Sequence, residues 1–482
     1  MMKKAWALGL AFAMVLGMTG CGEDNQQGPD NVEQMIEKSD DNIAKLTVWG
    51  SAQDQALLIK MVENFQEENR GQAEFDIKVE KMEEATAATA VLADMDKAAD
   101  VFVFEHLKLD ALVAAGALAP VQVPDAVERE VTSYAFNAAV FNNRLYAYPM
   151  ATSDSYVTFF NKDYINAAEA ASVTTALYKA ERLGKKFAMD WTDPDMLCCF
   201  LGSAELYIRE NEAGTGNETN INTIYGVHDG AEISQGMTDI ANSPGFAPLT
   251  DGEMLEGIRN GEVVGLIGSQ NMLEDLKALW GDKLGIARIP TVAFPGGQVD
   301  MSAPINYRLV GVNAYSRDAD WAHKLASYLT NEENQRLRLQ EKGDRPTDSS
   351  LANSTEATAN QLIKAINQQE KFCYAEETLP GYEAAFSAYA LWLYESKFPE
   401  YEQLTETGTG TILVKAGARV VDYQENLDNL QVAIENGGVF VPVPVTYPVV
   451  ELPVGYDTWE EVYEACKPYE ETTEEGVITD VQ

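Results

Sequence analysis

Short apolar segments that alternate with helical segments are the feature that most restricts the fold of this chain. Residues 46–49 and 101–104 are runs of apolar residues, and residues 75–80 alternate apolar and polar side chains with a period of two. Residues 54–69 and 83–95 lie between these runs and have helical character. Strands that alternate with helices predict an α/β fold with a doubly wound sheet.

The same alternation continues toward the C-terminus. Strands are predicted at residues 263–267 and 308–312, and helices at residues 321–330, 361–371 and 382–397. Residues 439–454 are rich in valine and proline, a composition that disfavours helix and favours extended edge structure. A chain of 482 residues has room for two or three domains of roughly 150 residues each.

The N-terminal segment has the composition of an export signal. Two lysines precede an apolar run, residues 5–18, which is too short to span a bilayer and is followed by small residues and Cys21. This ending resembles a bacterial lipobox. We predict that residues 1–20 form a lipoprotein signal peptide, that Cys21 is lipidated, and that residues 21–44 are a flexible tether. An ordinary export signal with an incidental cysteine is the alternative.

The charge of the chain excludes one class of partner. Acidic residues number 76 against 35 basic residues, which gives a net charge of −41. Such a field repels nucleic acid, so a nucleic-acid role is not expected. Most of these carboxylates are expected to be solvated surface, and a cation-binding cleft is the alternative. The histidines lie far apart in the sequence, so we predict no metal site and no cofactor.

Few cysteines and no catalytic motif are present in the remaining sequence. Beyond Cys21 the cysteines are Cys198, Cys199, Cys373 and Cys466, too few for a disulfide framework, and the sequence does not decide whether Cys373 pairs with Cys466. The glycine-rich residues 407–411 lack the Lys-Ser/Thr of a phosphate loop. We therefore expect no enzyme, although a carboxylate pair suited to glycoside hydrolysis stays open as an alternative.

Polar loops follow several of the predicted strands. Residues 49–54, 104–108 and 268–271 combine hydroxyls, amides, carboxylates and aromatic rings. In open α/β sheets, ligands bind beyond the carboxyl ends of the strands. Hydroxyls, amides and carboxylates hydrogen-bond polyols, and flat rings cover the apolar face of a sugar. These loops indicate reversible binding of a neutral polar ligand.

Several stretches together resemble a known family. They are residues 45–50, 100–108 with 115–118, 146–151 with 159–163, 311–316 and 343–347. The most specific element is the Y-x-x-P motif at residues 146–149 followed by Asn-Lys-Asp at residues 161–163. Across roughly residues 45–435, the chain resembles the extracellular solute-binding proteins of ABC importers, in the maltose/maltodextrin-binding group.

The resemblance implies a periplasmic-binding-protein-like fold of two doubly wound lobes, joined by a hinge, with a ligand cleft between them. It assigns residues 45–150 and 290–345 to an N-terminal lobe and residues 151–289 and 346–435 to a C-terminal lobe, and residues 436–482 form an extension without a counterpart. It further implies a saccharide ligand, an ABC permease as partner and a monomeric state. The protein would lie on the extracellular face of the cell membrane of a Gram-positive bacterium, attached only through its lipid.

Position by position, the resemblance also implies a set of ligand contacts. These are Ser51, Gln53, Asp54, Phe104, Glu105, His106, Lys108, Asp154, Tyr156, Trp191, Asp193, Gln270 and Tyr382, with Phe386 as an alternative to Tyr382. Phe104 and Gln270 stand where maltodextrin-binding proteins often have tryptophan, which leaves room for a smaller or differently shaped saccharide. Each aromatic residue has an alternative role in the core, but the polar, turn-like surroundings of Trp191 favour ligand contact.

Three other functions stay open at the level of sequence. The acidic loops make a polyamine or another cation the second candidate ligand. A secreted glycan hydrolase is the enzyme alternative. A surface adhesin or scaffold, with the Val/Pro-rich segment as its contact site, is the third.

Overall fold

A computed structural model describes most of the chain. It covers residues 43–202, 207–210, 217–221, 230–294, 297–374, 383–395, 411–413, 423–443 and 449–451. The predicted signal peptide, Cys21, Tyr382 and Cys466 lie outside the described residues, as does nearly all of the predicted tether. Among the helices that the structure describes, none is both long and apolar enough to cross a membrane.

One sheet runs through the molecule. Its order is β10 (Phe246–Pro248), β7 (Lys186–Met189), β11 (Val263–Ser269), β6 (Ala147–Asn161), β15 (Ala303–Val312), β3 (Val101–Glu105), β1 (Ile43–Gly50) and β2 (Glu74–Lys81). β12 (Leu284–Ala287) also pairs with β6, and β16 (Cys373–Tyr374) pairs with β15. β1 is parallel to β2 and β3, β7 is parallel to β10 and β11, and β6 and β15 are antiparallel to each other. The predicted α/β class is confirmed.

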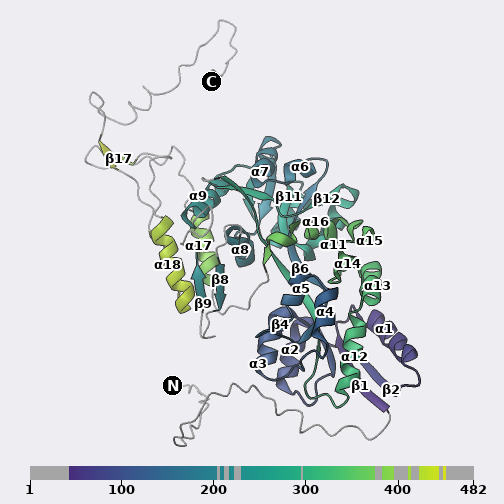
Figure 1. The fold of residues 1–482 in the computed structure, drawn as a ribbon. Coiled ribbons are helices and arrows are strands. Elements are labelled where there is room, and N and C mark those ends of the chain that lie inside the picture. Colours follow the sequence, from purple (N-terminus) through teal and green to yellow (C-terminus); the bar gives the residue numbers. More distant parts are fainter. Residues whose placement is uncertain are drawn as a thin grey trace, which may run out of the picture.

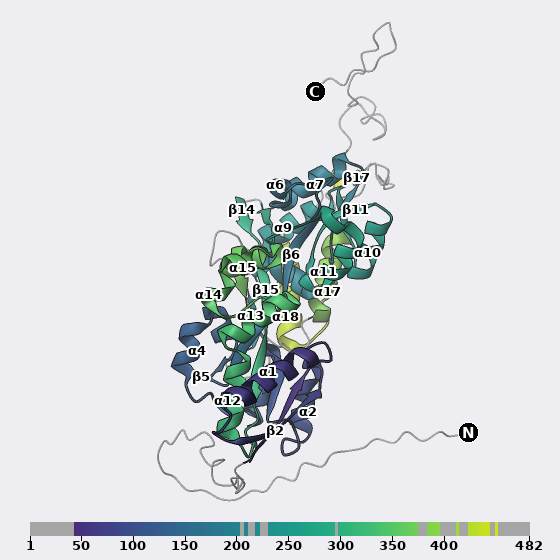
Figure 2. The ribbon, with the colours of Figure 1, turned by 90° about the vertical axis from the view of Figure 1, so that its right-hand side faces the viewer.

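Helices cover the sheet in two lobes, one above the other in Figures 1 and 2. The first lobe holds β1, β2 and β3 with α1 (Gln55–Glu68), α2 (Glu84–Ala93), α3 (Leu109–Ala114), α4 (Pro124–Glu130), α5 (Ser133–Asn137) and α12 (Ala319–Leu329). α1 buries Leu58, Met61 and Phe65, which share one helix face. Phe65 packs edge-on against Phe75 of β2 and Trp321 of α12. Each such buried side chain contributes about 1.5–3 kcal/mol.

The second lobe is built on β7, β10, β11 and β12. Its helices are α6 (Ala167–Ala170), α7 (Val173–Arg182), α8 (Pro194–Gly202), α9 (Gly230–Ala241), α10 (Asp251–Arg259), α11 (Leu273–Trp280), α16 (Gln361–Gln369), α17 (Glu383–Glu395) and α18 (Tyr423–Asn436). α13 (Glu332–Lys342), α14 (Ser349–Ala352) and α15 (Thr355–Thr358) lie along the side of the molecule, between the two lobes in Figure 2. Short two-stranded pairs are β4 (Val140–Phe141) with β5 (Arg144–Leu145), β8 (Tyr207–Glu210) with β9 (Asn217–Asn220), β13 (Thr291–Phe294) with β14 (Gly297–Asp300), and β17 (Thr411–Leu413) with β18 (Val449–Glu451).

β6 and β15 carry the chain from one lobe to the other. Up to Ser155, β6 pairs with β15, and from Tyr156 onward it pairs with β11 and β12. Gln369 of α16, which is fully buried, connects the middle of β6 to the segment that follows β12. Its amide donates to Ser155 Oγ (3.1 Å) and to the Tyr156 carbonyl (2.8 Å), and its oxygen accepts from Ile289 N–H (2.7 Å). We call the middle of β6, residues 152–156, the crossover segment.

The predicted elements compare well with those observed. The strands predicted at 46–49, 75–80, 101–104 and 263–267 correspond to β1, β2, β3 and β11, and the predicted helices at 54–69, 83–95 and 321–330 correspond to α1, α2 and α12. The strand predicted at 308–312 begins earlier, at Ala303, and the helix predicted at 361–371 ends in a 3-10 turn, Glu370–Phe372. The sequence did not predict that β6 is a single strand. The lobe boundaries stay a prediction.

Candidate functional site

The carboxyl ends of strands from both lobes approach the crossover segment. In the first lobe, β3 ends at Glu105, which pairs with Arg308 of β15. In the second lobe, β11 ends at Ser269, which pairs with Tyr156 of β6. Strands from the two lobes therefore point their carboxyl ends toward the same place from opposite sides. That is where open α/β sheets bind their ligands.

Hydrogen bonds bring several predicted site residues together at this place. Asp154 Oδ1 accepts from Ser269 Oγ (2.8 Å), and Gln270 Nε2 donates to the carbonyl of the residue before Asp154 (2.7 Å). The Tyr156 hydroxyl donates to the carboxylate of Asp193, which follows β7. We call Asp154, Tyr156, Asp193, Ser269 and Gln270 the crossover cluster. It presents carboxylate, hydroxyl and amide groups from three separate segments.

The two carboxylates of the crossover cluster are desolvated. Burial raises the pKa of Asp154 to about 6, while hydrogen bonds from Ser269 and from the Ser155 N–H oppose that rise. Burial likewise raises the pKa of Asp193, against the hydrogen bond from Tyr156. In the part of the chain that the structure describes, neither carboxylate has a salt bridge, and both are held by neutral donors. A ligand that donates hydrogen bonds would stabilise them.

Asp193 owes its position to the start of a helix. Its carboxylate accepts from Asp195 N–H (3.0 Å), and its carbonyl accepts from Leu197 N–H (3.2 Å), so it stands where α8 begins, with Pro194 as the first helical residue. Residues 192–195 thus form a helix start. Within the described ranges, no group of three or more His, Cys, Asp or Glu residues could hold a metal ion.

In the first lobe, the loop after β1 buries one of its three predicted site residues and leaves the other two at least partly exposed. Ser51 is half-buried and Gln53 is exposed, so neither side chain is enclosed by the protein. Asp54 is only 5% exposed, and its Oδ2 lies 2.6 Å from Arg338 Nη1. The expectation that Asp54 contacts ligand is therefore not met in this conformation, because its carboxylate is already paired inside the protein.

At the end of β3, two of the predicted site residues are buried and two are half-buried. Phe104 has 0% exposure and packs against Phe102 with 5.5 Å between ring centroids, so its ring offers no stacking surface here. His106 is buried, and its Nδ1 accepts from the Tyr307 N–H (3.2 Å). Glu105 and Lys108 are half-buried, and Glu105 pairs with Arg308 of β15.

Trp191 belongs to the hydrophobic core. Its side chain is 2% exposed, and its indole N–H donates to the Ala390 carbonyl of α17 (2.9 Å). Its ring packs edge-on against Phe246 (5.0 Å) and Phe200 (5.8 Å). The predicted ligand contact is therefore not met in this conformation. The turn-like sequence around Trp191 gave no sign that α17, nearly 200 residues later, covers it.

Two residues near the crossover segment were not among the predicted contacts. Ser269 donates to Asp154, and only its place in the loop after β11 could have suggested it. Tyr374 lies in β16 beside Pro304 of β15, is half-buried, and its hydroxyl donates to the Asp195 carbonyl (3.4 Å). No pattern in the sequence pointed to Tyr374.

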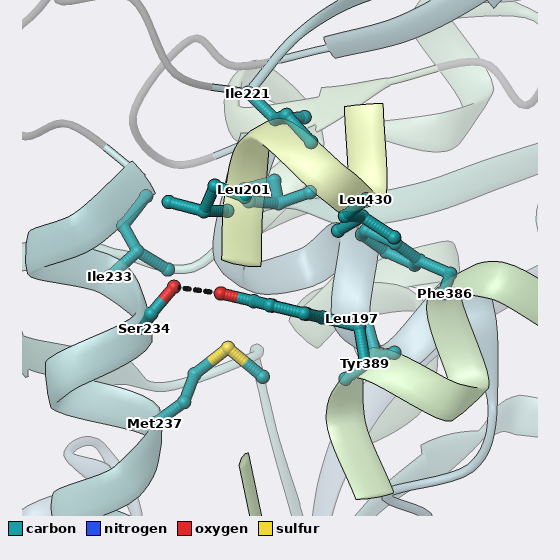
Figure 3. Close-up of a pocket in the computed structure, with 10 residues that line it drawn as sticks. Leu197, Leu201, Ile221, Ile233, Ser234, Met237, Phe386, Tyr389 and Leu430 are labelled. Carbon is teal, nitrogen blue, oxygen red and sulfur yellow. Dashed lines mark hydrogen bonds between the residues drawn. The ribbon is translucent and has the colours of Figure 1, made fainter. Parts of the chain in front are cut away.

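A separate internal cavity lies between α8, α9, α17 and α18 (Figure 3). Leu197, Met237, Phe386 and Leu430 are among the side chains that line it, and the Tyr389 hydroxyl meets Ser234 Oγ at its edge (2.5 Å). The cavity holds about 10 Å³, roughly the space of one water molecule, so it is a packing defect and no saccharide site. Phe386, the alternative to Tyr382, thus lies in the core.

Comparison with known proteins identifies the family. Residues 60–365 match the model of the bacterial extracellular solute-binding proteins, which is more than half of the chain. The chain belongs to this family. The predicted resemblance is thereby confirmed, and with it the class of protein: an extracellular solute-binding protein of bacterial type.

Individual similar proteins show how far the likeness extends. A galactooligosaccharide-binding protein of Bacillus subtilis is 24% identical over 393 residues, which cover 79% of this chain and 89% of that protein. A maltodextrin-binding protein from L. casei has a TM-score of 0.64 at 21% identity, covering 73% of this chain and 92% of that chain. A maltotriose-binding protein of Thermus thermophilus has a TM-score of 0.56 at 17% identity, covering 81% and 99%. The periplasmic-binding-protein-like fold of this solute-binding protein is therefore confirmed.

Proposed function

We propose that this solute-binding protein captures an oligosaccharide at the crossover cluster, between its two lobes, and delivers it to the permease of an ABC importer. The observation that carries the proposal is the convergence of strand ends from both lobes on Asp154, Tyr156 and Gln270. Carboxylates and amides at such a point hydrogen-bond the hydroxyl groups of a sugar. The named ligands of similar proteins, galacto-oligosaccharides and maltodextrins, agree with this chemistry.

The proposed contacts come from both lobes. Ser51, Gln53, Glu105 and Lys108 are exposed or half-buried in the first lobe. In the crossover cluster Asp154, Asp193, Ser269 and Gln270 are half-buried, and Tyr156 is buried. Closure of one lobe over the other would let each lobe supply part of the binding energy. We place the lobe boundaries near residues 150, 290 and 345, where the sequence predicts them.

The location and assembly of the protein are part of the same proposal. Residues 1–20 would be removed, Cys21 would carry the lipid, and residues 21–44 would tether a monomeric, non-enzymatic receptor to the outer face of the membrane. No cofactor enters this function. The lipobox-like sequence before Cys21 supports the anchor, and a Gram-positive host fits it. Labelling with a radioactive fatty acid, lost in Cys21→Ser, tests the anchor.

A cationic ligand is the second candidate. The carboxylates of Asp154 and Asp193 are desolvated and held by neutral donors, so a polyamine ammonium would also stabilise their charged forms. The two candidates differ in what they predict for ionic strength: polyamine binding would weaken steeply with added salt, and saccharide binding would change little.

A thermal-shift screen tests the proposed function. The protein without residues 1–21 would be heated with malto-, galacto-, xylo- and fructo-oligosaccharides and with spermidine and putrescine. A ligand that binds only the folded form stabilises it by about 2.7 kcal/mol at a hundredfold excess over its Kd. We expect a raised Tm with one saccharide series. A shift with polyamines alone would favour the second candidate, and a flat panel would contradict both.

A further inference from the structure

The loop between β1 and α1, residues 51–54, is held by an unusual arrangement at its last residue. Asp54 occupies the N-cap position of α1, where an aspartate ordinarily accepts a hydrogen bond from the first turn of the helix. Here its side chain makes no such bond. The carboxylate instead turns to Arg338, with 2.6 Å between Oδ2 and Nη1. The Asp54 carboxylate thus forms a long-range ion pair and does not cap the helix.

Arg338 holds this loop from α13, 284 residues later in the chain. Its side chain is 1% exposed, so the pair with Asp54 is almost free of competition from water. One turn further along α13, Lys342 donates to the Gln53 carbonyl, and its Nζ lies 3.8 Å from Asp54 Oδ1. On the other side of the loop, the Ala52 N–H donates to Glu83 (3.2 Å). These contacts leave the side chains of Ser51 and Gln53 free to face a ligand.

The same ion pairs extend toward the crossover segment. Arg338 Nη1 also lies 3.6 Å from Asp344, whose carboxylate is 3.1 Å from Arg308 of β15. The residue after Asp344 is Arg345, and its carbonyl accepts from the Thr152 N–H (3.1 Å) while its Nη1 donates to Thr152 Oγ1 (3.0 Å). The loop after β1 is thereby connected to the crossover segment through α13 and the turn that follows it.

We infer that Arg338 is a positioning residue, which fixes the loop of residues 51–54 relative to the crossover segment so that the loop is preorganised for ligand. The part of this inference that concerns ligand rests on the proposed function; the part that concerns the loop does not. In this arrangement Asp54 anchors the loop, and Ser51 and Gln53 are its ligand-facing residues. Preorganisation of this kind raises affinity by reducing the entropy lost on binding.

Hydrogen–deuterium exchange tests the positioning of the loop without any ligand. In Arg338→Met, we expect the Ala52 and Asp54 amides to exchange about tenfold faster, because local opening of the loop becomes easier. Arg336→Met is the matched control, since Arg336 lies in the same helix and its ion pairs within the described residues, with Glu332 and Glu356, are exposed. Its loop amides should exchange as in the unmodified protein.

A milder variant covers the case in which Arg338→Met does not fold. Asp54→Asn keeps the shape of the side chain and removes its charge, and it should accelerate exchange in the same loop. Unchanged exchange at residues 52–54 in a folded variant would overturn the inference. Equal acceleration in the loop and in β7 would also overturn it, because that pattern reports a loss of global stability alone.

Titration calorimetry with maltotriose and with a galacto-oligosaccharide then tests the consequence for binding. Relative to Arg336→Met, we expect Arg338→Met to weaken the Kd of the bound saccharide about tenfold, with an unchanged stoichiometry. An unchanged Kd in a variant whose loop exchanges faster would overturn the preorganisation of the site. If the unmodified protein binds neither saccharide, the proposed function fails, and the exchange experiment still decides the role of Arg338 in the loop.

Discussion

Replacing Asp154 by asparagine isolates the charge at the centre of the crossover cluster. Asp154 Oδ1 accepts both hydrogen bonds, from Ser269 Oγ and from the Ser155 N–H, each at 2.8 Å. An asparagine oxygen can accept the same two bonds, so the variant keeps the local geometry and loses the negative charge. A change in the free energy of unfolding then reports the cost of that charge.

The magnitude follows from the pKa of this group. Burial raises the pKa of Asp154 from its ordinary value of 3.8 to about 6. One pKa unit corresponds to about 1.4 kcal/mol, so ionisation of Asp154 costs the folded protein on the order of 3 kcal/mol at high pH. Because the higher pKa belongs to the folded state, the cost is absent below about pH 4 and grows until about pH 6. Above that pH it stays constant.

Urea unfolding at pH 4, 6 and 8 measures this difference. We expect Asp154→Asn to be more stable than the unmodified protein by on the order of 2 kcal/mol at pH 8, because the partly desolvated amide offsets about 1 kcal/mol of the gain. At pH 4 the charge cost is absent, so the variant should be less stable by about 1 kcal/mol or equally stable. Asp275→Asn, at an exposed position of α11, is the control and should show no such dependence. A variant that is no more stable at pH 8, or whose advantage persists at pH 4, would refute the reasoning.

Two further substitutions test the core and the crossover segment. Trp191→Phe should lower the free energy of unfolding by about 2 kcal/mol, because the hydrogen bond to Ala390 is lost and the ring is smaller. Calorimetry should show an unchanged saccharide affinity. A large loss of affinity would show that Trp191 contacts the ligand. Gln369→Leu should cost about 3 kcal/mol in urea unfolding, because three hydrogen bonds are lost and the buried Ile289 N–H is left unpaired. Gln361→Leu, exposed in the same helix, should be nearly neutral, and equal effects of the two would contradict this account.

Local patterns in the sequence predicted much of the fold. β3 and β11 are continuous apolar runs, and α1 carries its apolar residues on one face, so each element is specified by its own residues. β6 was not predicted as one strand because the polar residues 152–155 interrupt its apolar pattern. These residues are polar because they lie at the crossover segment, where they pair with other side chains and with β15.

The candidate site was predictable only in part. Gln270 follows the strand predicted at residues 263–267, so its place near a strand end was predictable from the order of strands and loops. Asp154 and Tyr156 lie in the middle of β6 and were expected only from the family resemblance. The burial of Trp191 by α17 and the pairing of Asp54 with Arg338 depend on segments far away in the sequence. Contacts between segments hundreds of residues apart leave no periodic signal in the sequence. Trp191 and Asp54 were therefore predicted to be accessible to ligand.

Isothermal titration calorimetry of the protein without residues 1–21 tests the central claim most directly. Malto- and galacto-oligosaccharides would be titrated at two temperatures, and spermidine at two salt concentrations. We predict one saccharide series that binds with one-to-one stoichiometry and little dependence on salt. Its binding should carry a negative heat-capacity change as the lobes bury apolar surface. Binding of spermidine alone, or no heat from any saccharide, would contradict the assignment of a carbohydrate receptor.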